Sequence, residues 1–235
     1  MRDLSFSIQN GETLAILGRT GSGKSTVINL LMRQFDPIDG EIRVDGKPLK
    51  SININDFRKQ TGVVPQEVFL FSDSIRNNVL FGLSAHQKAN EDTIKEVLKT
   101  THVWHNIKTF KNGLDTILGE RGVNLSGGQK QRISIARALI REPKLLILDD
   151  CLSAVDTETE EIILDNIKPQ IKKNTTLIVS HRVSSIRNAD RILVLDHGQK
   201  IEEGSHEELL AQNGVYADMY AKQLLEDQNG GEDDK

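Results

Sequence analysis

The residues Gly18-Arg19-Thr20-Gly21-Ser22-Gly23-Lys24-Ser25-Thr26 carry the first chemical signal in this chain. They fit the pattern G-x-x-x-x-G-K-[ST], in which glycines let backbone N–H groups curl around phosphate oxygens. The apolar run Thr13–Leu17 before them predicts a buried strand, and the residues after them predict a helix with one apolar face. The helix N-terminus adds partial positive charge. We therefore predict a phosphate loop, with Lys24 reaching the β- and γ-phosphates and Ser25 ligating Mg²⁺.

A second signal is the acidic pair Asp149-Asp150, which ends the apolar run Leu145–Leu148. Such a run predicts a strand whose carboxyl end lies at the sheet edge where nucleotide clefts form. Asp149 is predicted to hold Mg²⁺, and Asp150 is predicted to polarise the attacking water. Acids that merely end a strand are common, but a phosphate loop in the same chain favours the functional interpretation.

The third signal is Leu125-Ser126-Gly127-Gly128-Gln129, which precedes an amphipathic helical pattern that runs to Ile140. Ser126 and Gln129 have the spacing of a capping box. The segment therefore predicts a helix N-terminus with two glycines, which is a second anion site in the same chain.

Together these three features resemble the ATP-binding cassette (ABC) family. The other landmarks of that family follow in order: Gln66 matches the Q-loop glutamine, Ser153–Asp156 matches the D-loop and His181 matches the switch histidine. The resemblance covers Leu4 to about Leu225. It implies ATP and Mg²⁺ as cofactors, with Ser25, Gln66 and Asp149 at the metal. It implies Lys24, Gln66, Asp150 and His181 as catalytic residues, with Gln66 and His181 also contacting the nucleotide.

The resemblance also implies a head-to-tail pair of domains, formed with a homologous partner chain or with a second copy. Each ATP then lies between the phosphate loop of one domain and the signature Ser126-Gly127-Gly128-Gln129 of the other. In that arrangement Ser126 and Gly128 contact the γ-phosphate, so ATP joins the pair and hydrolysis releases it.

Further segments are similar to those of ABC exporters. Gly119-Glu120-Arg121-Gly122 resembles the X-loop, which contacts transmembrane domains, and Asn77–Gly82 resembles the exporter segment after the Q-loop. Val68–Phe71 either seats a coupling helix or packs in the core. These segments imply an exporter ATPase at the cytoplasmic face of the cell (inner) membrane, with a transmembrane domain fused upstream and export powered by ATP-driven dimerisation.

Two positions depart from the family pattern. The family usually has Glu after the magnesium Asp, whereas Asp150 is one methylene shorter. We therefore predict slow hydrolysis at this site, as in the degenerate half of a heterodimeric exporter; the alternative is a homodimer in which Asp150 is a competent but slower base. The chain also opens at the strand pattern Asp3–Ile8, without the earlier aromatic residue that stacks on adenine. That start predicts a fragment or excised domain with reduced nucleotide affinity.

The elements that must position these residues predict an α/β fold. The resemblance implies the P-loop NTPase fold of ABC ATPases, with a RecA-like parallel-sheet core, a small antiparallel β-subdomain and an α-helical signature subdomain. Residues 1–225 are predicted to form this domain, with the helical subdomain over about 72–140 and a disordered acidic tail over 226–235. Further expectations are strands at Leu4–Ile8, Glu41–Val44 and Thr176–Val179, a hairpin joining Arg191–Leu195 to Lys200–Glu202, a first helix ending near Asp36-Pro37, and a C-terminal helix Glu207–Leu225 that breaks at Asn213-Gly214.

The bulk composition is that of an ordinary soluble globular domain. The chain has 235 residues, a formal net charge of -4, 37% hydrophobic and 27% charged residues. This mild acidity argues against nucleic acid as a partner. Cys151 is the one cysteine and is predicted to pack in the core, whereas Glu158, Glu160 and Glu161 are predicted to form a solvated helix face. No run approaches the ~18 apolar residues of a membrane helix.

Two other functions remain open from the sequence. One is a soluble ABC ATPase that acts on DNA or ribosomes, although the exporter-like segments argue against it. The other is a regulatory module that binds ATP, dimerises and hardly hydrolyses, which Asp150 keeps open.

Overall fold

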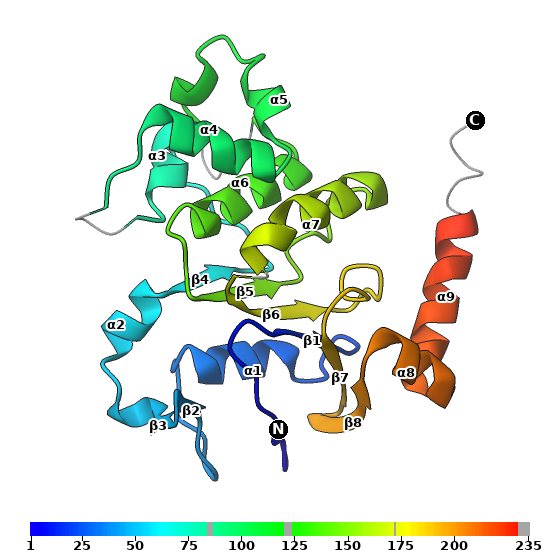
Figure 1. Cartoon of the computed structure of the whole chain (residues 1–235). Helices are drawn as coiled ribbons and strands as arrows, with labels where there is room; N and C mark the ends of the chain where they lie inside the picture. Colours follow the sequence, from blue (N-terminus) through cyan, green and yellow to red (C-terminus); the bar gives the residue numbers. More distant parts are fainter. Residues whose placement is uncertain (84–86, 120–123, 172, 230–235) are drawn as a thin grey trace.

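The computed structural model describes residues 1–83, 87–119, 124–171 and 173–229 (Figure 1). Within these residues a six-stranded sheet has the order β4-β5-β6-β1-β7-β8. Its strands are β1 (Thr13–Leu17), β4 (Thr61–Val64), β5 (Leu145–Asp149), β6 (Thr175–Ser180), β7 (Arg191–Asp196) and β8 (Gln199–Gly204). Strands β4, β5, β6, β1 and β7 are parallel, and β8 returns antiparallel to β7. The parallel core and the final hairpin are confirmed.

The sheet is covered by helices on both faces (Figure 1). Helix α1 (Lys24–Leu31) packs Val27 and Ile28 on one face, against apolar side chains of β1 and β6. Helices α6 (Gly127–Leu139) and α7 (Thr157–Ile171) cover the other face. Burial on both faces is why these strands are continuous apolar runs in the sequence.

Four neighbouring strands deliver the predicted site residues to one sheet edge. Because β4, β5, β6 and β1 are parallel, their carboxyl ends lie together. The chain leaving these ends carries Gln66, Asp149-Asp150, His181 and the phosphate loop, respectively. The topology therefore assembles the site from segments far apart in sequence.

A small antiparallel sheet lies beside the main sheet. It pairs β2 (Arg43–Val44) with β3 (Lys47–Pro48), and the 3₁₀ turn Leu49–Ser51 and helix α2 (Ile54–Lys59) follow. The predicted strand at Leu4–Ile8 is wrong, since in the described chain this segment joins neither sheet.

The alternation that suggested the Leu4–Ile8 strand is nevertheless real. Leu4, Phe6 and Ile8 are half-buried against the cluster under the sheet. The carbonyl of Ser7 accepts from the Arg191 guanidinium rather than from a neighbouring strand. Alternation of apolar and polar residues therefore indicated that one side of this segment is buried. An extended segment that pairs with no neighbouring strand can bury one side in the same way.

Helix α1 ends at Leu31, so the predicted end near Asp36-Pro37 is wrong. Arg33 takes the left-handed conformation with φ +49°, and Gln34 N–H donates to Asn29 O at 2.9 Å. This is a Schellman end, which usually carries glycine. A non-glycine residue at that position left no signal in the sequence.

The helical part comprises α3 (Ile75–Leu80), α4 (Glu91–Thr100), α5 (Trp104–Ile107), the 3₁₀ turn Gly113–Asp115 and α6. These elements share an apolar cluster of their own, with Ile75, Ile94 and Ile133 fully buried. In Val68–Phe71 core packing holds for Leu70, which is buried in this cluster, whereas Phe69 is 52% exposed and the coupling-helix contact stays a prediction. The predicted X-loop falls on residues of which only Gly119 is described.

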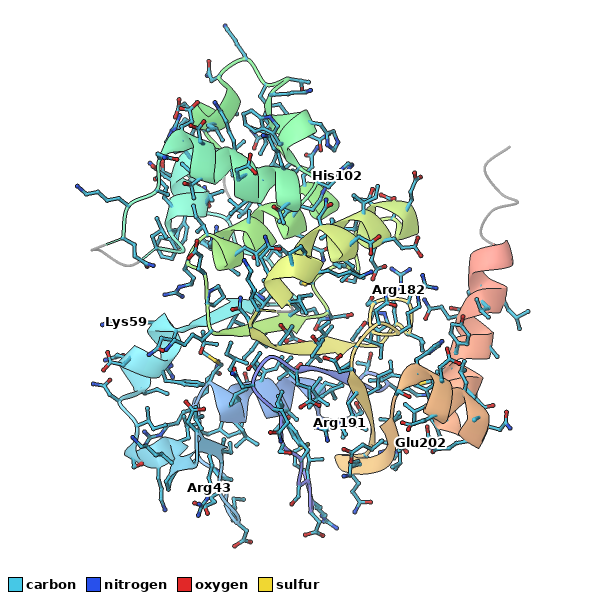
Figure 2. The ribbon with its side chains drawn as sticks, viewed as in Figure 1. Arg43, Lys59, His102, Arg182, Arg191 and Glu202 are labelled. Carbon is cyan, nitrogen blue, oxygen red and sulfur yellow. The ribbon has the colours of Figure 1, made fainter. Side chains whose placement is uncertain are left out.

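The C-terminal part is two helices, α8 (His206–Gln212) and α9 (Val215–Asn229). The break between them is confirmed, since Asn213 has φ +50°. Glu202 on β8 accepts hydrogen bonds from the N–H groups of Val215 (2.5 Å) and Tyr216 (2.9 Å), which fixes the start of α9 (Figure 2). Across the described segments, no helix combines the length and apolar character needed to cross a membrane. The predicted disordered tail over 226–235 is wrong in its first part, because residues 226–229 continue α9; residues 230–235 lie outside the described chain.

The approach of α3 to α6 predicts a position that tolerates no side chain. A methyl group added at Gly82 would collide with the carbonyl oxygen of Arg137. We expect Gly82→Ala to lower the free energy of unfolding by about 1–3 kcal/mol, as overpacking does, measured by urea denaturation.

Gly40 supplies the control for that measurement. Its φ is +77° and no atom lies within 4 Å of an added Cβ. Gly40→Ala should therefore lower the free energy of unfolding only by the cost of placing a non-glycine residue in the left-handed region, about 1–2 kcal/mol. A Gly82→Ala variant that unfolds at the wild-type urea concentration would contradict the close approach.

Candidate functional site

The phosphate loop joins β1 to α1, as the sequence predicts. Gly18 is buried, and a Cβ there would lie 2.5 Å from the carbonyl oxygen of Leu195 and would also collide with Ser22. Gly21 and Gly23 have φ of +84° and +103°. These glycines are therefore required by a close approach and by left-handed backbone. Among the other loop residues, Arg19, Thr20, Gly21 and Ser25 are exposed, Thr26 is half-buried and Ser22 is buried.

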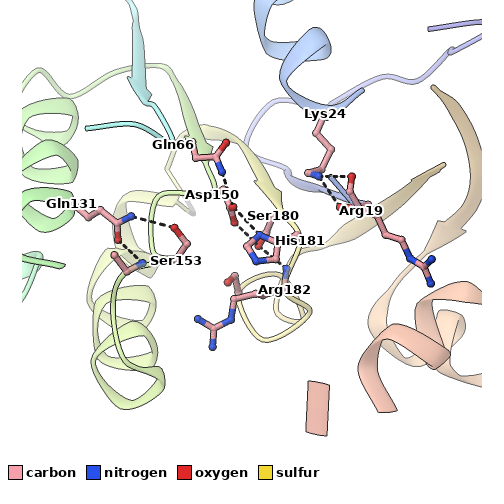
Figure 3. A network of polar contacts seen from close by, with 12 residues as sticks. Arg19, Lys24, Gln66, Gln131, Asp150, Ser153, Ser180, His181 and Arg182 are labelled. Atoms are coloured by element: carbon pink, nitrogen blue, oxygen red, sulfur yellow. Dashed lines mark hydrogen bonds and ion pairs between the residues drawn. The ribbon is translucent and has the colours of Figure 1, made fainter. Parts of the chain in front are cut away.

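Lys24 turns its side chain back into this loop (Figure 3). Its Nζ donates to Gly18 O at 2.6 Å and to Arg19 O at 3.0 Å. Burial lowers the pKa of Lys24, and the carboxylates of Asp149 and Asp150 oppose that shift. The ammonium group is thus held by two carbonyl oxygens, and the nearby carboxylates offset only part of the cost of its burial.

Asp150 is the centre of the polar contacts at the sheet edge (Figure 3). Its Oδ2 lies 2.7 Å from His181 Nδ1 and accepts from Gln66 Nε2 at 3.4 Å. Its Oδ1 accepts from the Ser180 hydroxyl at 3.3 Å. The structure therefore brings together the residues predicted at the ends of β4, β5 and β6.

The backbone of Asp150 is in the left-handed region, with φ +46°. Asp and Asn enter this region more readily than other non-glycine residues because their short polar side chains bond locally. The Asp150 N–H also donates to Val179 O at 2.7 Å. Strained backbone of this kind is concentrated at functional sites.

Asp149 is half-buried beside this centre, and its environment suits a divalent cation. Burial raises the pKa of Asp149, the neighbouring Asp150 raises it further, and Lys24 lowers it. Among the described residues no group of three or more His, Cys, Asp or Glu could hold a metal ion. Mg²⁺ does not need such a group, since it takes one or two carboxylates together with waters and phosphate oxygens. The Asp149 carboxylate and the exposed Ser25 hydroxyl fit that donor set.

The signature segment caps α6 in the predicted way. Ser126 Oγ accepts from Gln129 N–H at 3.2 Å, and Gln129 Oε1 accepts from Ser126 N–H at 3.0 Å, which confirms the capping box. Ser126 and Gly127 are exposed, and Gly128 is buried with Ala154 O only 3.0 Å from an added Cβ. The helix start therefore faces outward on a fixed support.

Gln131, which sequence reasoning missed, ties this helix to the segment Ser153–Asp156. It donates to Ser153 Oγ at 3.3 Å and accepts from Ala154 N–H at 3.0 Å (Figure 3). Ser180, also missed, bonds Asp150 and accepts from Arg182 N–H at 3.0 Å. Ser180 directly precedes the switch histidine, which was the available signal.

The predicted solvated face of α7 is wrong at one position. Glu158 and Glu161 are exposed, but Glu160 is 1% exposed, bonds the Ser185 hydroxyl and pairs with Arg182 at 3.3 Å. Burial raises the pKa of Glu160. Glu160 continues the apolar stripe of Ile163, Ile167 and Ile171, and that spacing would have placed it inward. Cys151 is confirmed as a buried packing residue.

The comparisons with known proteins all point to one family. The family model described as "ABC transporter" matches residues 1–153. An ATP-dependent lipid A-core flippase of Alcanivorax borkumensis is 46% identical over 227 residues, which are 97% of this chain and 39% of that protein. A probable multidrug resistance ABC transporter ATP-binding/permease protein, YheI of Bacillus subtilis, is 45% identical over 225 residues, 96% of this chain and 38% of that protein.

A solved structure gives the same result at the level of the fold. A bacterial Atm1-family ABC exporter with ATP bound superposes with a TM-score of 0.89 and 40% identity, covering 94% of this chain and 38% of that one. The chain belongs to the ABC transporter family and corresponds to its ATPase domain. It spans less than two fifths of the length of these relatives.

The neighbouring carboxylates Asp149 and Asp150 are expected to lower the stability of the folded domain. Because the folded-state pKa of Asp149 is raised, its ionisation lowers the stability of the fold: the loss begins as the pH rises through the lower unfolded-state pKa and is complete above the folded-state pKa. We expect Asp149→Asn to raise the melting temperature at neutral pH, by about 2–4 °C for each 1 kcal/mol of relieved desolvation cost and repulsion. The gain should fade below about pH 4, where the carboxyl group is protonated in both states.

Asp196→Asn is the matched control for thermal denaturation across pH, because Asp196 also ends a parallel strand, and the ion pair recorded for it is with His197 at 3.9 Å rather than with a predicted site residue. A lower melting temperature for Asp149→Asn at neutral pH would show that Asp149 is stabilised where it lies.

Proposed function

We propose that this chain binds and hydrolyses ATP as the motor domain of an exporter. The observation that carries the proposal is the convergence of the phosphate loop, Asp149-Asp150, Gln66 and His181 at one sheet edge. Relatives named as a lipid A-core flippase and an ATP-binding/permease protein support the exporter branch. A transmembrane domain fused upstream would place this domain at the cytoplasmic face of the cell membrane.

Each residue group has a distinct role in this proposal. The loop Gly18–Thr26 would cradle the phosphates through its backbone N–H groups and the start of α1. Lys24 would exchange its contacts with Gly18 and Arg19 carbonyls for phosphate oxygens. Asp150, oriented by His181 and Gln66, would accept the proton of the attacking water.

Ser25, Gln66 and Asp149 would hold Mg²⁺. The ion, when bound, would neutralise charge on the β- and γ-phosphates. The raised pKa of Asp149 supports this assignment, because a cation would relieve the repulsion between Asp149 and Asp150.

The site of this chain is proposed to hydrolyse slowly. A general base contributes roughly 10²–10⁴-fold to the rate, and a misplacement near 1 Å costs about 10²-fold. Asp150 is one methylene shorter than Glu and is already held by His181, Ser180 and Gln66. Both effects keep its carboxylate close to the sheet edge rather than advanced toward a water.

Asp150→Glu should therefore raise kcat by about 10²-fold if reach is the limit, with ATP affinity unchanged because the phosphate loop is untouched. Steady-state turnover with Mg²⁺ and saturating ATP measures the first, and equilibrium nucleotide binding measures the second. Asp196→Glu makes the same substitution at a strand end that carries no predicted site residue, and it should leave both unchanged. Equal turnover of wild type and Asp150→Glu would make Asp150 a competent base and favour a homodimer.

The partner is proposed to be a second ABC ATPase domain that meets this chain head to tail. The chain combines an intact Ser126–Gln129 signature with a weakened base, and this combination favours a heterodimer. In such a dimer the signature of this chain would complete the more active site on the partner. The outward-facing, capped start of α6 supports that role.

A shared site makes a complementation prediction. In the Asp150→Glu background, Lys24→Ala removes one half of each site and Ser126→Arg blocks the other, so each variant alone should lose turnover. Mixing them creates dimers with one complete site, and about a quarter of the parent rate should return in a random mixture of paired subunits. Absence of recovery in a mixture shown to exchange subunits would contradict a site built from two chains.

A regulatory subunit that binds ATP but hardly hydrolyses it is the second candidate function. Asp150 supports it, and the turnover of the wild-type chain distinguishes it, because a regulatory subunit would bind ATP without measurable hydrolysis. The net charge of -4 and the exporter relatives favour both of these candidates over a soluble ATPase acting on nucleic acid or ribosomes.

A further inference from the structure

The loop after the switch histidine is bound by the C-terminal helix. The amide oxygen Oε1 of Gln223, on α9, accepts from Val183 N–H at 2.7 Å and from Ser184 N–H at 3.4 Å. Val183 is two residues beyond His181, and its side chain is 1% exposed. One side chain near the end of the chain therefore satisfies two backbone donors next to the proposed site.

Helix α9 is itself firmly attached to the domain. Tyr216 is fully buried, its hydroxyl lies 2.7 Å from His206 Nδ1, and its N–H is bound by Glu202. Met219 and Tyr220 pack against the main core cluster. Gln223 continues this buried stripe at the next helical turn, so the helix directs it toward the loop. A polar residue on such a stripe needs hydrogen-bond partners, which Val183 and Ser184 provide.

The opposite side of the loop is held by α7. Glu160 bonds the Ser185 hydroxyl and pairs with Arg182, and Glu161 pairs with Arg187 at 2.8 Å. Arg182 lies in the loop between these two helices (Figure 2). The loop is thus clamped from two directions by side chains outside the phosphate site.

The clamp matters because His181 has little support of its own. Its side chain is 47% exposed, yet its Nδ1 lies 2.7 Å from Asp150 Oδ2. The position of an exposed ring depends on the backbone that carries it. That backbone is fixed on one side by β6 and on the other by the segment that Gln223 caps.

We propose that Gln223 is a positioning residue for the switch histidine, so that the C-terminal helix sets the contact between His181 and Asp150. The expected effect of Gln223 on turnover rests on the proposed function. The expected effect of Gln223 on the position of His181 does not. Gln223 contacts neither the phosphate loop nor the carboxylates in the described contacts, so its effect passes through the loop at Val183 and Ser184.

The geometric part is tested by the side-chain ¹⁵N NMR signals of His181 in the full chain. Gln223→Leu and Gln223→Met remove the acceptor while keeping bulk, and Gln223→Glu keeps an acceptor oxygen. We expect the His181 Nδ1 signal in the first two to move toward its position in an Asp150→Ala reference, and to return in Gln223→Glu. Gln212→Leu, on the exposed end of α8, is the matched control and should leave the signal in place. An unmoved His181 signal in folded Gln223→Leu or Gln223→Met overturns the proposal.

The catalytic part is tested by turnover in the Asp150→Glu background. We expect kcat to fall about tenfold in Gln223→Leu, within the range that small misplacements cause, with KM for ATP unchanged and kcat restored in Gln223→Glu. A shifted His181 signal with undiminished kcat would support the positioning role and count against His181 in the proposed function. His181→Ala, measured alongside, reports on the proposed function alone.

Discussion

Two adjacent carboxylates at the end of β5, Asp149 and Asp150, impose the constraint on which the rest of the site depends. Removing like charges from water is unfavourable, and the raised pKa of Asp149 records that cost. Lys24 offsets part of it, although burial lowers its own pKa. Asp150 is satisfied by hydrogen bonds from neighbouring strands instead. The surplus of negative charge beside a loop built for anions suits a site that takes a metal ion and phosphate together.

The signature helix α6 and the loop after His181 are joined by continuous contacts. Gln131 connects the signature helix to Ser153 and Ala154, and α7 begins directly after that segment. One turn into α7, Glu160 reaches Arg182 beside the switch histidine. A shift of the signature helix would therefore strain the same loop that carries His181.

Sequence patterns succeeded where one local property decides the structure. Continuous apolar runs gave the central strands, and the Ser126–Gln129 spacing gave the capping box. They failed where several outcomes share one pattern. The alternation at Leu4–Ile8 reflects a buried side of an extended segment that forms no strand ladder. Helix α1 ends at a left-handed Arg33, and without the usual glycine the sequence gives no sign of that end. Glu160 was placed in solvent because its two acidic neighbours, which are exposed, dominated the pattern.

The sequence by itself determined the local structure of the phosphate loop, the acidic pair and the signature, since each is a short run whose spacing fixes its local geometry. It also determined the parallel core, because burial on both faces leaves continuous apolar strands. Only the tertiary structure decided how these runs meet. The strand order that sets Asp150 beside His181, the inward turn of Glu160 and the reach of Gln223 to Val183 all join residues distant in the chain. Such contacts depend on packing between elements, which no local spacing encodes.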